Sequence, residues 1–114
     1  MTTGPAPLYV DTFELCRWLM ERFRTSSEAL PRHICQSGLG LLQAVTLALK
    51  GRRREEHMEM ADERLIALRT QLRLAAACGY LEEAQMLFAL ERADRIGRQL
   101  GGWMKSQEQG SRRL

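Results

Sequence analysis

The chain has 114 residues, which is enough for one domain with a single hydrophobic core of modest size. Apolar residues make up 45% of it and charged residues 27%, so wholesale disorder is excluded. No apolar run has the length of a membrane span. The net charge of +3 is weak support for a polyanionic partner. The fifteen Arg against two Lys either favour contacts with phosphates or carboxylates, or reflect a GC-rich genome. Because strong helix formers dominate, we expect an all-α protein.

Residues 1–6 are predicted to be a flexible lead-in, and they lack the basic-then-apolar layout of a signal peptide. The three cysteines, Cys16, Cys35 and Cys78, are odd in number and widely spaced, without a Cys-x-x-Cys pair. This pattern favours reduced, buried thiols that act as small apolar residues. We therefore expect a cytoplasmic protein.

A first helix is predicted from about Pro7 to Arg24. Its apolar stripe steps by four and three residues through Tyr9, Phe13, Cys16, Met20 and Phe23. In an alternative interpretation, Asp11 and Glu14 form a capping box and the helix starts later.

A second helix is predicted from Pro31, which suits a first helical turn, to about Lys50. Its expected core residues are Ile34, Leu41, Leu42, Val45 and Leu49. Gly38 and Gly40 lie inside it, and each costs about 1 kcal/mol of helix stability. Both glycines would be tolerated if another backbone approaches closely at that point.

Gly51 and the basic run 52–54 predict a turn, followed by a third helix to about Cys78 with Gly79 as its C-cap. The third helix has its apolar stripe at Met58, Ala61, Leu65, Leu68, Leu72 and Ala75. A fourth helix is predicted from about Glu82 to Lys105, with its stripe at Met86, Leu90, Ala93, Gly97, Leu100 and Met104. Four amphipathic segments with short breaks predict an up-down-up-down antiparallel four-helix bundle over residues 7–106, followed by a flexible tail at 107–114.

The sequence contains few residues that could act in catalysis. His33 and His57 lie on different predicted helices, and neither has a carboxylate at metal-ligand spacing. The four core stripes contain no carboxylate or histidine, which a metal-binding or ligand-binding bundle enzyme would need. We therefore expect a non-enzyme with no metal and no cofactor.

Arginines recur at helical spacing on the third and fourth predicted helices. They are Arg69, Arg73, Arg92, Arg95 and Arg98. These side chains either form one electropositive patch between neighbouring helices, or pair with Glu63, Glu91 and Asp94 inside the bundle. Arg52, Arg53 and Arg54 form a second candidate patch at the end of the bundle.

Gly101 and Gly102 weaken the end of the fourth helix, and a large amphipathic anchor, Trp103, follows them. Either Trp103 simply closes the bundle, or another subunit packs against the bare glycine backbone. A small bundle has little core to spare, so we expect a cyclic homo-oligomer that buries additional apolar surface.

Two segments resemble the accessory variability determinant (Avd) proteins of diversity-generating retroelements. One is residues 68–75 followed by Gly79-Tyr80-Leu81, and the other is Ile96 to Ser106, with the sequence IGRQLGGWMKS. Trp18-Leu19 and Pro31-Arg32 also fit, and the resemblance covers about residues 8–106.

The resemblance implies a four-helix bundle that assembles into a homopentamer. It also implies binding to the retroelement's reverse transcriptase and to template RNA or cDNA, in support of mutagenic retrohoming and without polymerase activity. Under this hypothesis the arginines named above make the contacts, and residues 101–103 serve packing or oligomerisation. The alternative is an interaction bundle of the type encoded by rRNA intervening sequences, without a retroelement partner.

Overall fold

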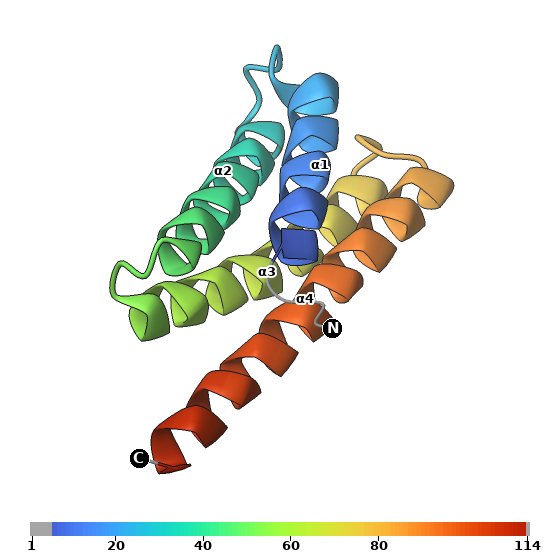
Figure 1. Ribbon diagram of the computed structural model, residues 1–114. Helices are drawn as coiled ribbons and strands as arrows, with labels where there is room; N and C mark the ends of the chain where they lie inside the picture. Colours follow the sequence, from blue (N-terminus) through green and yellow to red (C-terminus); the bar gives the residue numbers. More distant parts are fainter. Residues whose placement is uncertain (1–5, 114) are drawn as a thin grey trace.

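The computed structural model describes residues 6–113, and the side chains of residues 6–110. It contains four helices: α1 (Ala6–Phe23), α2 (Ala29–Leu49), α3 (Arg54–Ala77) and α4 (Glu83–Arg113). Each helix packs against two others, α1 and α3 both lying against α2 and α4 (Figure 1). Short turns reverse the chain between consecutive helices. The predicted all-α four-helix bundle is confirmed.

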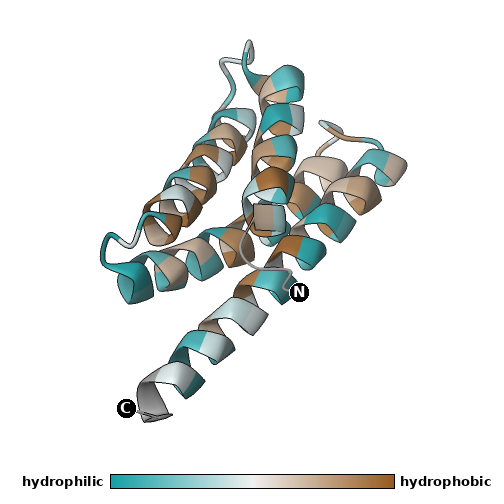
Figure 2. Cartoon of the chain, in the orientation of Figure 1, coloured by the Kyte–Doolittle hydropathy of each residue, from teal (hydrophilic) through white to brown (hydrophobic). Residues whose placement is uncertain are grey.

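The core is a single cluster of mainly aliphatic side chains contributed by all four helices. Hydrophobic and hydrophilic residues alternate along the helices, as expected for amphipathic helices (Figure 2). All six residues of the stripe predicted for α3 are buried. Their strict spacing by three and four residues places them on one side of the helix, so the prediction for this helix was correct.

The apolar stripe predicted for α1 is wrong at two positions. Tyr9 and Phe13 are exposed, and their rings contact each other with centroids 6.0 Å apart. The buried side instead runs through the row one residue earlier, which includes Leu8, Thr12 and Leu15. Both rows have helical spacing, and the row that contains Leu8, Thr12 and Leu15 is the one that faces the other helices.

The start of α1 agrees with the prediction of about Pro7 to within one residue, and the alternative start is wrong. The helix begins at Ala6, which excludes a capping box at Asp11 and removes Ala6 from the predicted lead-in. The remainder of that lead-in, residues 1–5, lies outside the described residues. The second helix begins at Ala29, two residues before Pro31, which still falls in the first turn where no backbone N–H is required.

Another backbone approaches α2 closely at one of its two helical glycines. A Cβ on Gly38 would lie 3.0 Å from Leu19 Cδ1 and 4.0 Å from the Cα atom of Cys16, so the backbone of α1 does lie close. Gly40 is different, because the side chain of Arg64 covers it, with Nε 3.0 Å from the Cβ position. The condition of a neighbouring backbone is therefore met at Gly38, and a side chain takes that place at Gly40.

The ends of α2 and α3 share one geometry. Gly51 and Gly79 have φ angles of +78° and +86°. The Gly79 N–H donates to the Ala76 carbonyl, and the next N–H, that of Tyr80, donates to the Ala75 carbonyl. This is the Schellman arrangement, in which Cys78 is the C-cap residue of α3 and Gly79 follows it. The prediction that Gly79 ends the helix is confirmed, although the cap position itself is one residue earlier.

The fourth helix is longer than predicted. It continues to Arg113 instead of ending near Lys105, and its last turns extend beyond the body of the bundle (Figure 1). Residues 105–109 contain strong helix formers and no proline, so the helical hydrogen-bond pattern propagates through them. The side chains of residues 105–110 are exposed. The flexibility predicted for this tail stays a prediction.

Candidate functional site

Arg69 is bound within the bundle. Its Nε donates to Asp94 Oδ1 across 2.9 Å, which joins α3 to α4. The same guanidinium covers Gly97, where a Cβ would lie 2.6 Å from Arg69 Nη2. The lack of a side chain at Gly97 therefore leaves room for this ion pair. Of the two interpretations of the arginines, intramolecular pairing is the one that applies to Arg69.

Arg73 and Arg98 are exposed, and neither has an ion pair with any side chain among residues 6–110. Arg95 differs, because its Nη2 lies 3.5 Å from Glu91 Oε2 on the same helix. Glu63, the third acidic residue considered as a partner, forms no ion pair with an arginine among residues 6–110.

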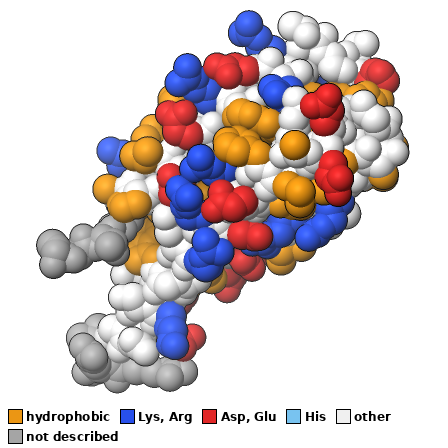
Figure 3. All heavy atoms as spheres, turned by 90° about the vertical axis from the view of Figure 1, so that its right-hand side faces the viewer, with side chains coloured by type: hydrophobic (Ala, Val, Ile, Leu, Met, Phe, Trp, Pro, Cys, Tyr) orange, Lys and Arg blue, Asp and Glu red, His pale blue; other side chains and the backbone are white. Residues whose placement is uncertain are grey.

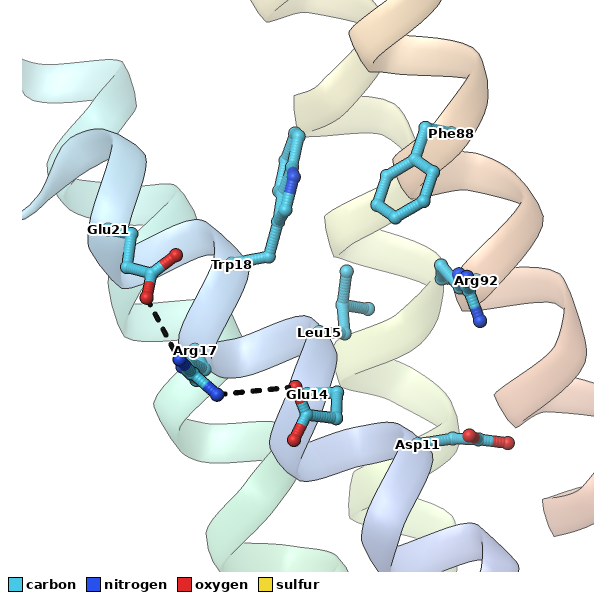
Figure 4. Close-up of a pocket in the computed structure, with 8 residues that line it drawn as sticks. All are labelled: Asp11, Glu14, Leu15, Arg17, Trp18, Glu21, Phe88 and Arg92. Carbon is cyan, nitrogen blue, oxygen red and sulfur yellow. Dashed lines mark hydrogen bonds and ion pairs between the residues drawn. The ribbon is translucent and has the colours of Figure 1, made fainter.

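Arg92 lies on the other side of α4 from the Arg69–Asp94 pair. Its guanidinium lies over the ring of Phe88, 5.0 Å from the centroid, beside α1 (Figure 4). Position 92 is about 200° around the helix from position 94, which faces α3. The structure therefore does not bring the arginines of α3 and α4 into one continuous row.

The basic turn at residues 52–54 is held in a defined shape. The buried ring of His57 hydrogen-bonds through Nδ1 to the carbonyl of Arg52, and Arg53 has a left-handed φ of 45°. Arg54 donates to the Ala48 carbonyl across 3.0 Å. The side chains of Arg52 and Arg53 remain exposed. Sequence reasoning missed this role of His57, since it considered the histidine only as a ligand or catalyst.

Residues 101–103 combine bare backbone with a packed ring. Gly101 and Gly102 are exposed, and a Cβ at either would meet nothing within 4 Å. Trp103 is half-buried against the core, and the Arg54 guanidinium lies 5.4 Å from its ring centroid. The ring therefore closes the end of the bundle, while the two glycines face open space.

A groove between α1 and α4 was not predicted from the sequence. Its volume is about 390 Å³, and its walls include Asp11, Glu14, Arg17, Trp18, Phe88 and Arg92 (Figure 4). We call it the α1–α4 groove. The face of the molecule in Figure 3 shows apolar side chains exposed among charged ones of both signs. The groove residues on α1 and those on α4 are separated by about seventy positions in the chain. No local spacing in the sequence therefore indicates the groove.

The cysteines and acidic groups do not form a recognisable chemical centre. Cys16 and Cys35 are buried as predicted. The prediction is wrong for Cys78, which is exposed because it is the C-cap residue of α3, at the end of the helix. Burial raises the pKa of both buried thiols, and the nearby Cys35 raises that of Cys16 further. Over the described residues, no three His, Cys, Asp or Glu side chains are grouped to hold a metal ion, and no helix is long and apolar enough to cross a membrane.

A comparison with known protein families matches residues 14–107 to the bAvd-like family. The chain belongs to this family. The resemblance inferred from residues 68–81 and 96–106 is therefore confirmed, and the protein is an accessory protein of the Avd type. No curated protein and no solved structure matches the chain. In this Avd-like protein the matched region includes both arginine groups, Trp103 and most of the α1–α4 groove.

Proposed function

We propose that this Avd-like protein is a non-enzymatic accessory subunit of a diversity-generating retroelement. In this function it binds the reverse transcriptase and the template RNA or cDNA, and it supports mutagenic retrohoming. The family match over residues 14–107 carries the proposal, because it spans nearly the whole bundle. The exposed arginines supply the groups that such partners require.

The structure ranks the eight candidate arginines by availability. Arg52, Arg73 and Arg98 are exposed and have no ion pair with the side chains of residues 6–110, so we assign them the primary contacts with phosphate or protein carboxylate. The others have intramolecular partners and take secondary or structural roles. They are Arg53, Arg54, Arg69, Arg92 and Arg95.

A triple variant tests the nucleic-acid contacts. Arg52→Gln, Arg73→Gln and Arg98→Gln together should weaken binding of a single-stranded RNA oligonucleotide and flatten its salt dependence by about one logarithmic slope unit per lost phosphate contact. The control is Arg24→Gln with Arg32→Gln, two exposed arginines outside the candidate set, and the two variants are compared by the loss per charge removed. Equal losses per charge would contradict the assignment.

The reverse transcriptase contact is tested by co-purification. A tagged copy of this chain should retain, at low salt, the reverse transcriptase encoded near its gene, and the triple variant should retain less. The gene neighbourhood separates this function from that of an intervening-sequence bundle, because the retroelement function requires that gene and paired template and variable repeats. Failure to co-purify at low salt would count heavily against the proposal.

We also propose a cyclic homo-oligomer, a pentamer by resemblance, in which a neighbouring subunit packs on Gly101 and Gly102. Both glycines lack any group within 4 Å of the Cβ position, so Gly102→Leu should leave the fold of one subunit intact. We expect it to reduce the mass measured by light scattering. A wild-type monomer at micromolar concentration, or an unchanged mass for the variant, would overturn this interface.

A further inference from the structure

The α1–α4 groove has the features of a site for a cationic side chain. We propose that it binds an arginine carried by a basic segment of a partner protein. The groove lies between α1 and α4, and none of Arg52, Arg73 and Arg98 lines it. The proposal therefore does not depend on the retroelement function.

The charge of the groove is the first observation. Three carboxylates line it, those of Asp11, Glu14 and Glu21, against two guanidinium groups. Arg17 is held between two of these acids, 3.8 Å from Glu14 and 3.2 Å from Glu21. Asp11 accepts a hydrogen bond from Gln99 but has no ion pair within the described part of the chain. A protein of net charge +3 thus has a groove with an acidic excess.

The aromatic rings are the second observation. Trp18 and Phe88 contact each other with centroids 5.6 Å apart and planes tilted by 42°. Each ring already carries a guanidinium of this chain on one side, Arg22 at 4.4 Å from Trp18 and Arg92 at 5.0 Å from Phe88. Phe88 is still 42% exposed. These rings therefore attract guanidinium groups, as the quadrupole of an aromatic face does in general.

The shape of the groove suits one flat side chain that enters from solvent. Leu15, which is 3% exposed, forms an apolar floor between the aromatic wall and the carboxylates (Figure 4). An arginine over this floor can stack by Phe88 and donate paired hydrogen bonds to the free oxygens of Glu14 or Asp11. A nucleic-acid strand is disfavoured, because its phosphates would meet the same carboxylates.

The test uses the fluorescence of Trp18. The chain has two tryptophans, so Trp103→Phe leaves Trp18 as the sole reporter. The probe is a short synthetic peptide with one central arginine, and its matched control carries citrulline, which keeps the shape but not the charge. We expect the arginine peptide to change the Trp18 emission in a saturable way and the citrulline peptide to bind at least about tenfold more weakly.

Substitutions in this background locate the contact. Glu14→Gln and Asp11→Asn should each weaken the arginine peptide by about tenfold, because each removes a charged acceptor. Arg17→Gln should strengthen it, because it releases Glu14 and Glu21. Glu63→Gln, an exposed acid on α3 outside the groove, is the control and should have no effect.

Three results would overturn the proposal. The first is equal binding of the arginine and citrulline peptides, or binding that the groove variants do not change. The second is a stronger response to a single-stranded oligonucleotide than to the peptide, which would make the groove a base-stacking site. The third is a fall in oligomer mass for Glu14→Gln, which would make a second copy of this chain the occupant.

Discussion

At the scale of single residues, the helical glycines differ in what surrounds the position of the missing side chain. Gly38 has Leu19 Cδ1 at 3.0 Å from that position, inside a packed contact between α1 and α2. Gly101 has nothing within 4 Å. A glycine in a helix costs about 1 kcal/mol relative to alanine, so replacement has opposite net effects at the two positions.

Gly38→Ala should lower the free energy of unfolding by about 1 kcal/mol. The added methyl group overpacks against Leu19, which is 1% exposed, and this cost is larger than the stability gained from the higher helix propensity of alanine. Gly101→Ala is the matched control and should raise the free energy of unfolding of the isolated subunit by about 0.5 to 1 kcal/mol. Urea unfolding of both variants measures these changes. A stabilised Gly38→Ala would show that the α1–α2 contact is looser than described.

The three thiols should also differ in reactivity. Burial raises the pKa of Cys16 and Cys35, which lowers the fraction of reactive thiolate, and it also blocks access. Cys78 is exposed. A disulfide reagent should therefore modify one thiol per native chain quickly and the remaining two only after unfolding. Cys78→Ser should abolish the fast reaction, and a persisting fast reaction would contradict the buried positions of the other two.

At the scale of elements, the turn before α2 is tied to the turn before α4. Glu28 is the N-cap residue of α2 but makes no side-chain capping bond. Its carboxylate instead accepts a hydrogen bond from the Tyr80 hydroxyl across 2.6 Å. This contact joins positions 52 residues apart at one end of the bundle.

The hydrogen bond to Glu28 raises the pKa of Tyr80 above its usual value of about 10. A raised folded-state pKa means that this contact stabilises the fold below pH of about 10 and that its contribution is lost as pH rises through the folded-state pKa. With Tyr9→Phe, Tyr80 is the only tyrosine, and its absorbance reports the titration. Glu28→Gln should lower the measured pKa, whereas Glu83→Gln should leave it unchanged.

At the scale of the whole molecule, α4 has two parts that differ in whether their side chains pack against the core. Up to Met104 its side chains contribute to the bundle, and Trp103 and Met104 are half-buried against the core. Beyond that the side chains of residues 105–110 are exposed. The last turns therefore add length to the helix without adding to the core.

Two shortened chains test this division. A chain that ends after Ser106 should unfold within about 0.5 kcal/mol of the full chain, as expected for the loss of surface residues. A chain that ends after Gly102 also loses Trp103 and Met104, and half-burial of these side chains is worth about 2 kcal/mol. Urea unfolding compares them. Equal stability of the two shortened chains would show that Trp103 does not anchor the bundle.

The sequence predicted the helices and their antiparallel order well, because each core stripe is a local pattern repeated over several turns. It was less reliable for α1, where two adjacent rows both have apolar helical spacing and only packing selects between them. It also ended α4 too early, because the two glycines suggested a weak end where the helix continues. The arginines were found by their spacing, and two of the three acids considered as partners, Glu91 and Asp94, do pair with arginines. The spacing did not indicate which arginines stay without an ion pair.

By itself, the sequence determined the all-α class, the four-helix bundle and the family, since periodicity, turn residues and the segment around Gly101-Gly102-Trp103 are properties of neighbours along the chain. Only the tertiary structure decided which arginines are available. It paired Arg69 with Asp94, placed Arg92 beside α1 and left Arg73 and Arg98 exposed. It also assembled the α1–α4 groove. These features depend on distances between helices, which no spacing within one helix specifies.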